Sequence, residues 1–102
     1  MWARTGVMII VTGAAVLRPD DVDEAIAIAL EHVHRSRTEP GCVLHSVHRD
    51  VEDPNRLLFL EQWVDRAALD AHFAVPDSLD FVTRLSELAA EPPTMAIHET
   101  ST

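Results

Sequence analysis

An apolar run near the start of the chain predicts its first β-strand. Residues Met8–Leu17 read MIIVTGAAVL, and most of them are β-branched or aliphatic. Such side chains favour strands, and an almost continuous apolar run is typical of a strand that is covered on both faces. We therefore expect a buried strand at the start of the fold.

The next segment has the period of an amphipathic helix. Between Arg18 and Arg37, the apolar positions that fall on one helical stripe are Val22, Ile26, Ala29, Leu30 and Val33. Asp20 or Asp21 suits the N-cap, because a short carboxylate accepts hydrogen bonds from the first free amides. Pro40-Gly41 is expected to end the helix.

The middle of the chain predicts a hairpin and then two helices. Cys42–Asp50 and Leu57–Val64 are apolar-rich segments separated by a turn cluster of Asp, Pro and Asn, which indicates two antiparallel strands. Asp65 caps a short helix, Arg66–Ala74, and another helix follows from Pro76-Asp77 to about Ala90. The apolar positions of this last helix are Leu79, Val82, Leu85, Leu88 and Ala89.

A short strand over Thr94–Glu99 is the last predicted element. The order is then β-α-β-β-α-β with a split second helix, which is the ferredoxin-like α+β fold with an antiparallel sheet. Two helices cover only one face of such a sheet, whereas the first strand is apolar on both sides. A second copy is the simplest cover for the other face, so we expect a homodimer.

The net charge and the cysteine content limit which partners and cross-links the chain can have. The chain has 17 acidic and 8 basic residues, which gives a formal net charge of −9. A chain this acidic lacks the positive surface that binds phosphate backbones or anionic lipids, so we expect neither nucleic acid nor membrane as a partner. Cys42 is the single cysteine, which excludes an intrachain disulfide. Without an apolar run of membrane length, the expected location is the cytoplasm.

Residues 8–102 contain no repeat or linker, and they are expected to form a single domain. Residues 1–7 are expected to be an N-terminal extension, and either Met1 or Met8 can be the start.

One stretch, RTEPGCVLHSVHRDVEDPNRLLFLEQWVDRAALDAHF, resembles the antibiotic biosynthesis monooxygenase (ABM) family. The residues that carry the resemblance are Glu39-Pro40-Gly41-Cys42, Arg49-Asp50, Asp53-Pro54-Asn55-Arg56, Glu61-x-Trp63 and Ala68-Leu69-x-x-His72. The resemblance implies ferredoxin-like subunits that pair into a dimeric α+β barrel, each with a pocket between its sheet and its helices. Some members oxidise polycyclic phenols to quinones with dioxygen alone, and others degrade haem or act on quinols.

The resemblance makes His72, Trp63 and Glu61 the catalytic candidates. Glu61 and Trp63 share one face of their strand, and the matching Trp of the family lines the pocket. Either a desolvated Glu61 or a neutral His72 can act as a general base toward a phenol. Each residue also has a structural alternative: a core Trp, a carboxylate that accepts amides, or a packing His.

His45, Phe59, Trp63 and Thr12 are the predicted substrate-binding residues. His45 stands where the family often has Tyr. His45 and His48 lie three residues apart on one predicted strand, so they point to opposite faces and cannot share a metal ion.

We expect no metal site and no cofactor. His32 and His34 lie about 200° apart around the first predicted helix, His34 nearer the edge of the apolar stripe, and both are expected in solvent. Haem-degrading relatives use a His of the second helix, and residues 77–90 contain none. Quinone-forming relatives carry an Asn four residues before the Trp, where this chain has Phe59.

Three functions remain open at this point. The first is a cofactor-independent monooxygenase that oxidises a phenol, hydroquinone or anthrone with dioxygen. The second, favoured by Phe59 in place of the family Asn, is a non-catalytic dimer that binds a small ligand or a protein. The third is an isomerase that acts on a small polar metabolite. A pocket filled by bulky side chains would favour the second.

Overall fold

The computed structural model describes residues 7–101, and the predicted elements follow one another in the predicted order. Of the predicted extension, residues 1–6 lie outside the described residues, and Val7 begins the first strand. The elements are β1 (Val7–Val16), η1 (Pro19–Asp21), α1 (Val22–Ser36), β2 (Cys42–Arg49), β3 (Arg56–Trp63), α2 (Arg66–Ala74), α3 (Pro76–Leu88) and β4 (Thr94–Ser101).

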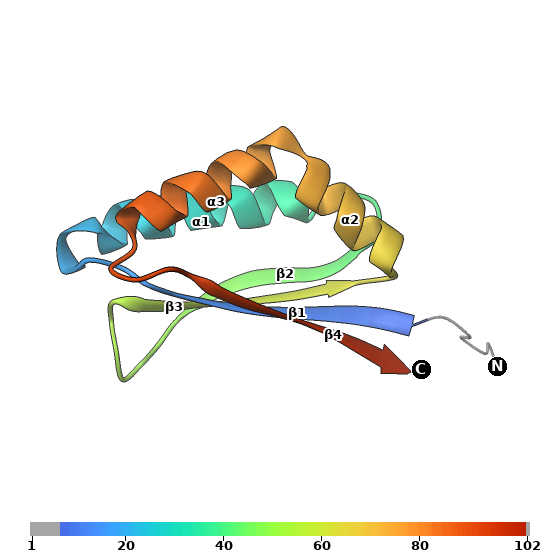
Figure 1. The fold of residues 1–102 in the computed structure, drawn as a ribbon, viewed down its shortest axis with the longest axis horizontal. Coiled ribbons are helices and arrows are strands. Elements are labelled where there is room, and N and C mark those ends of the chain that lie inside the picture. Colours follow the sequence, from blue (N-terminus) through green and yellow to red (C-terminus); the bar gives the residue numbers. More distant parts are fainter. Residues whose placement is uncertain (1–6, 102) are drawn as a thin grey trace.

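The four strands form one antiparallel sheet in the order β2-β3-β1-β4. The hairpin strand β3 therefore lies between β1 and β2, and β1 lies between β3 and β4, which is the ferredoxin-like topology. Figure 1 shows α1, α2 and α3 together on one side of the sheet. The predicted α+β ferredoxin-like fold is confirmed.

Strand residues alternate between the face under the helices and the open face. Ile9, Val11 and Ala15 of β1 are buried under the helices, whereas Thr12 between them is exposed on the other side. The covered face has two separate apolar clusters. One is centred on Ala15, Leu57, Phe81 and Leu85, and the other consists of Ile9, Val11, Trp63 and Leu69.

The face that α1 buries differs from the predicted stripe. Leu30 was predicted to be inside and is exposed, whereas His32 was predicted in solvent and is buried. The helix turns its small residues Ala25 and Ala29 inward with Ile28, which lets it lie close to the sheet. This rotation carries His32, three residues after Ala29, to the inside.

In α3 the apolar positions are also split between inside and outside. Leu85 is buried, as is Ala89 directly after the helix, but Leu79 and Val82 are exposed. The residues that pack inward with Leu85 are Ser78 and Phe81. Leu79 and Val82 are apolar positions of the helix, but they do not belong to the core. Both side chains line the cavity described below.

The remaining differences are at the ends of the elements. β4 extends two residues past the predicted Glu99, because its pairing with β1 continues to Val7, which lies opposite Ser101. Asp21 is the N-cap residue of α1 but makes no capping hydrogen bond; its carboxylate accepts from Arg18 Nε at 2.9 Å instead. Asp65 caps α2 as predicted, accepting from the amide of Ala68 at 2.8 Å.

The open face of the sheet keeps an apolar centre. Leu60 is exposed there, and Ile10 is half buried, although no described helix lies above them. The homodimer that would cover this face stays a prediction. Among residues 7–101, no helix is long and apolar enough to cross a membrane.

Candidate functional site

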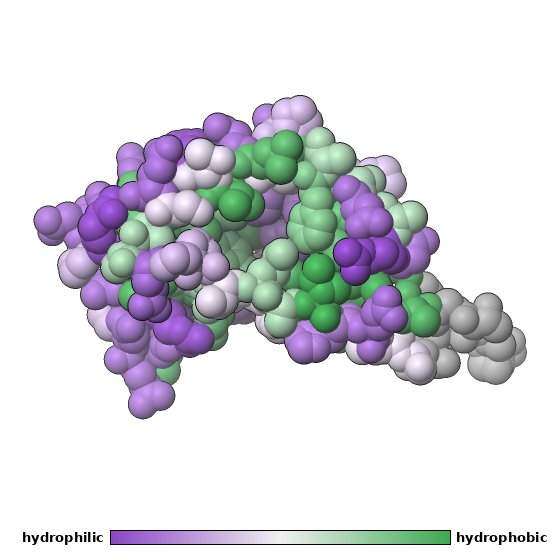
Figure 2. Space-filling view, viewed as in Figure 1, coloured by the Kyte–Doolittle hydropathy of each residue, from purple (hydrophilic) through white to green (hydrophobic). Residues whose placement is uncertain are grey.

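A cavity of about 370 Å³ lies between the sheet and α3. Most of its wall is apolar and comes from Phe59 of β3, Phe81 of α3 and Met95 of β4. Leu79 and Val82 also line it although they are 60% and 58% exposed, so they stand at its mouth. Figure 2 shows the hollow between the helical layer and the sheet, with apolar residues around it.

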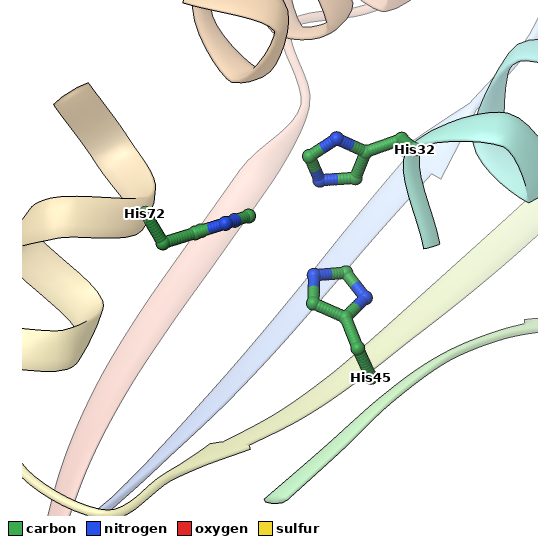
Figure 3. A group of neighbouring side chains, drawn as sticks. All are labelled: His32, His45 and His72. Atoms are coloured by element: carbon green, nitrogen blue, oxygen red, sulfur yellow. The ribbon is translucent and has the colours of Figure 1, made fainter. Parts of the chain in front are cut away.

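Four titratable side chains form the inner, polar end of this cavity. They are His32 from α1, His45 from β2, Glu61 from β3 and His72 from α2, and all four are buried. Figure 3 shows the three imidazole rings converging from three different elements. A buried polar group lowers stability unless it is hydrogen-bonded, so such a cluster in a domain of this size calls for a role.

Glu61 connects the members of the cluster. The sheet register places it directly opposite His45, and the Nε2 of His45 lies 3.4 Å from Glu61 Oε1. Trp63, two residues along the same strand face, donates its Nε1–H to the same oxygen at 2.9 Å. His72 Nε2 lies 3.8 Å from it. One carboxylate oxygen therefore faces three nitrogen atoms.

These contacts hold Glu61 in its charged form. Burial by itself raises the pKa of Glu61, but the contacts with the His45 and Trp63 side chains and the nearby His72 outweigh burial and hold the pKa below its usual value. A carboxylate with a lowered pKa is a weak base toward a phenol. The electrostatics therefore favour the structural, anchoring interpretation of Glu61 over the general-base one.

His72 is oriented by a carboxylate from outside its own helix. Its Nδ1 lies 2.9 Å from Oε1 of Glu39, which belongs to the turn between α1 and β2. Since a carboxylate only accepts, Nδ1 carries the proton, and the lone pair of the neutral ring is on Nε2. Arg35 fixes Glu39 in turn through a 2.6 Å contact from Nη1 to Oε2.

His32 is a neutral imidazole held between a cation and an aromatic ring. Arg35 Nη2 donates to its Nδ1 at 3.0 Å, and its ring stacks on Phe81 with centroids 4.1 Å apart. Burial lowers the pKa of His32 to about 3, and the neighbouring His45, His72 and Arg35 add to this effect. The ring is therefore uncharged at any physiological pH.

Four of the six predicted site residues line the cavity: His45, Phe59, Glu61 and His72. Trp63 is fully buried behind this wall, where its ring packs on His72 with centroids 4.6 Å apart. The expectation that Trp63 forms the wall is therefore corrected: it supports Glu61 and His72 from behind.

Thr12 does not line the cavity of its own chain. It is exposed on the open face, because the strand alternation that turns Val11 and Gly13 toward the helices turns Thr12 away from them. His45 and His48 do point to opposite faces, as predicted, with His45 buried and His48 exposed.

Sequence reasoning missed His32, Glu39 and Arg35. His32 lies three residues after Ala29 and four before Ser36, all of which are buried. A polar residue at an apolar helical position was therefore the available signal. Glu39 gave no such signal, because its partner His72 is 33 residues away along the chain. Arg35 forms a local i,i+4 pair with Glu39, but such a pair is common on helix surfaces and does not by itself indicate a site.

The family model of the antibiotic biosynthesis monooxygenases matches residues 8–84, which is most of the chain and includes the whole polar end of the cavity. The chain belongs to the antibiotic biosynthesis monooxygenase family. This ABM chain is 38% identical over 91 residues to the uncharacterized protein sll1783 of Synechocystis. That alignment covers 89% of this chain but only 62% of the Synechocystis protein.

Two further comparisons agree with the assignment. The Bacillus subtilis protein YcnE, which is named a monooxygenase without an established activity, is 28% identical over 85 residues, with 83% of this chain and 90% of YcnE covered. A crystal structure titled antibiotic biosynthesis monooxygenase superposes with a TM-score of 0.85 at 26% identity and covers 92% of this chain and 99% of that one.

Proposed function

We propose that this ABM protein is a cofactor-independent monooxygenase that oxidises a small electron-rich aromatic, such as an anthrone or a hydroquinone, with dioxygen. The observation that carries the proposal is the Glu39–His72 pair at the inner end of an apolar cavity. A carboxylate that holds Nδ1–H leaves Nε2 as a base directed toward a ligand, which is the arrangement used in general-base catalysis.

The size and lining of the cavity suit an aromatic substrate. A volume of about 370 Å³ lies within the usual range for sites that bind small molecules. Phe59 and Phe81, with ring centroids 5.9 Å apart and inclined at 67°, offer the edge and face that a flat ring packs against. The substrate's acidic group would then lie at the polar end, beside His72.

The chemistry needs a base and a water-poor site. For an anthrone, His72 Nε2 takes the proton of the acidic C–H, and the resulting anion gives electrons to dioxygen. A C–O bond forms to give a hydroperoxide, whose O–O bond then breaks with loss of water. One oxygen atom ends in the ketone and the other in water. Glu61 stabilises the imidazolium that forms, and the apolar walls keep bulk water from the anion.

The assay is anaerobic mixing of the purified protein with an anthrone or hydroquinone, followed by addition of oxygen. We expect quinone formation faster than in buffer, with one dioxygen consumed per anthrone oxidised. His72→Gln should lower the rate at least about 100-fold, since general bases contribute roughly 10²–10⁴-fold. His48→Gln, an exposed residue of the open face, is the control and should keep the full rate.

A second candidate is a non-catalytic dimer that binds a small apolar ligand. Phe59 favours it, because the cavity wall at this position has no donor for a substrate oxygen. The two candidates differ in a single result. If anthrones or hydroquinones bind saturably while oxidation proceeds at the buffer rate across a broad panel, the binding function replaces the enzymatic one.

A further inference from the structure

We propose that His32, His45 and His72 form a binding site for a first-row divalent transition-metal ion such as Zn²⁺. The three side chains come from α1, β2 and α2, and each is buried. One ring nitrogen of each lies within 4.8 Å of those of the others, and Figure 3 shows the rings facing a common centre. Imidazole is a preferred ligand of Zn, Cu, Ni and Fe, whereas Mg²⁺ and Ca²⁺ prefer oxygen.

His45 provides a second, independent observation. Within the described part of the chain, neither of its ring nitrogens makes a hydrogen bond, although both are shielded from solvent. The Nε2 atom has only the 3.4 Å contact with Glu61 Oε1 described above. Buried polar atoms are nearly always satisfied, so an orphaned imidazole indicates a missing partner. A metal ion at the centre of the cluster would provide a partner for one of the two nitrogens.

His72 and Glu61 already have the arrangement of a metal site. Metal-binding His residues usually donate their other N–H to a carboxylate, and His72 donates Nδ1–H to Glu39 in this way. Its Nε2 is then free to bind. Glu61 Oε1 lies 3.4 Å from His45 Nε2 and 3.8 Å from His72 Nε2, so it can complete a set of three nitrogens and one oxygen.

To bind the metal ion, the three ring nitrogens must move closer together. Zn–N bonds of 2.0–2.1 Å in a tetrahedron separate the nitrogens by about 3.3 Å, so the rings must approach one another by up to about 1.5 Å. The cavity on one side gives the side chains room to rotate. The same cavity gives an outside ligand access to the ion.

Arg35 disfavours metal binding at one of the three histidines, His32. Its Nη2 donates to His32 Nδ1, which leaves the proton of neutral His32 on Nε2. For His32 to bind through Nε2, that proton must move to Nδ1, and Arg35 must release the ring. Arg35 has other partners, with Glu39 Oε2 at 2.6 Å and Ser78 Oγ at 3.0 Å. Arg35→Gln, which can accept from Nδ1–H, should therefore increase the affinity for metal.

The site goes beyond the proposed oxidation and competes with it. The Nε2 lone pair of His72 cannot bind a metal ion and accept a substrate proton at the same time. Metal loading should therefore inhibit the oxidation that the metal-free protein performs. Binding itself is measured without substrate, so failure of either proposal leaves the other standing.

The experiment titrates the chelator-treated full chain with Zn²⁺ by calorimetry and with Co²⁺ by visible absorption. We expect one ion per chain, the intense absorption of four-coordinate Co²⁺, and no binding of Mg²⁺ or Ca²⁺. His32→Ala, His45→Ala and His72→Ala should each weaken Zn²⁺ binding by more than about 100-fold, and Glu61→Gln by about 10–100-fold. The matched controls are His34→Ala and His48→Ala, which change exposed residues of α1 and β2.

Circular dichroism of each variant identifies those that fold, and His→Gln replacements serve for any that do not. No saturable binding by the wild-type chain overturns the proposal. So does an equal loss of affinity in the His34 and His48 controls, because that result would place the ion on the surface.

Discussion

Glu39 Oε1 and His72 Nδ1 lie 2.9 Å apart although 33 residues separate them in the chain. The contact joins the turn before β2 to the last turn of α2 and fixes which nitrogen of His72 carries the proton. Arg35, one helical turn before Glu39, holds the other carboxylate oxygen. A buried base is thus oriented by a pair of charges at the end of a helix.

Replacing Glu39 should allow the proton of neutral His72 to occupy either ring nitrogen. In Glu39→Ala, His72 Nδ1 loses its acceptor, so the fixed Nδ1–H form should give way to a mixture of tautomers. Nitrogen chemical shifts of the imidazole measure this directly. We also expect the turnover number for the proposed substrate to fall by about 10-fold or more with little change in KM. Glu52→Ala in the β2–β3 turn is the control, and unaltered His72 shifts in Glu39→Ala would contradict this prediction.

Trp63→Phe should destabilise the protein through Glu61. The substitution keeps most of the ring but removes the indole N–H that donates to the buried carboxylate at 2.9 Å. An unsatisfied buried acceptor costs about 1–3 kcal/mol, and urea unfolding should show a loss of that size. The same substitution in a Glu61→Gln background should cost less. An identical loss in both backgrounds would show that the indole acts by packing alone.

Leu79→Ser should weaken ligand binding without affecting stability. The side chain is 60% exposed, so its loss should change the free energy of unfolding by less than about 0.5 kcal/mol. It nevertheless lines the mouth of the cavity, and an aromatic ligand should bind several-fold more weakly, at about 0.8 kcal/mol per lost CH₂ contact. Val51→Ser, at a nearly fully exposed position outside the cavity, is the matched control for fluorescence titration.

Gly41→Ala should be strongly destabilising. Gly41 has a φ of +84°, and a Cβ there would lie 2.6 Å from the Cβ of Ala68. Backbone strain and overlap together should lower the free energy of unfolding by more than about 2 kcal/mol. At Gly13 an added Cβ meets Thr94 O at 3.4 Å, so Gly13→Ala should cost less. Urea unfolding of the two variants tests the order.

The thiol of Cys42 should react slowly in the folded chain. Burial raises its pKa, and the charges of Glu39 and Glu61 raise it further. The thiolate is the reactive form, so a raised pKa leaves less of it at a given pH. The pH midpoint of alkylation by iodoacetamide should therefore lie higher in the native protein than in the same chain in guanidinium. A native midpoint at or below the unfolded one would contradict this.

The sequence predicted the order of elements and the sheet topology, and four of its six candidate site residues line the cavity. These features depend on local periodicity and on strand alternation. It could not predict the network around His72. Contacts such as Glu39 with His72 arise from how α1 and α2 pack on the sheet, and no short-range pattern reports that packing.

The exposed pair Leu79 and Val82 shows a second limit. Helical periodicity assigns apolar residues to a core, yet these two face the entrance of a cavity. His32 shows the converse, because a polar side chain at a core position was interpreted as solvated. In both cases the wrongly assigned burial concerns residues that line the cavity, where the rule that apolar residues are buried and polar residues exposed does not hold.

The division of the covered face into two apolar clusters has a consequence for divergence within the lineage. Phe81 and Leu85 belong to one cluster, whereas Trp63, which supports the ionisable end, belongs to the other. Substitutions at Leu85 can therefore reshape the hydrophobic compartment without touching the base and its supports, whereas Phe81 also stacks on His32. Substrate preference can therefore change through substitutions in the cavity wall, while Glu39, His72 and Trp63 stay the same.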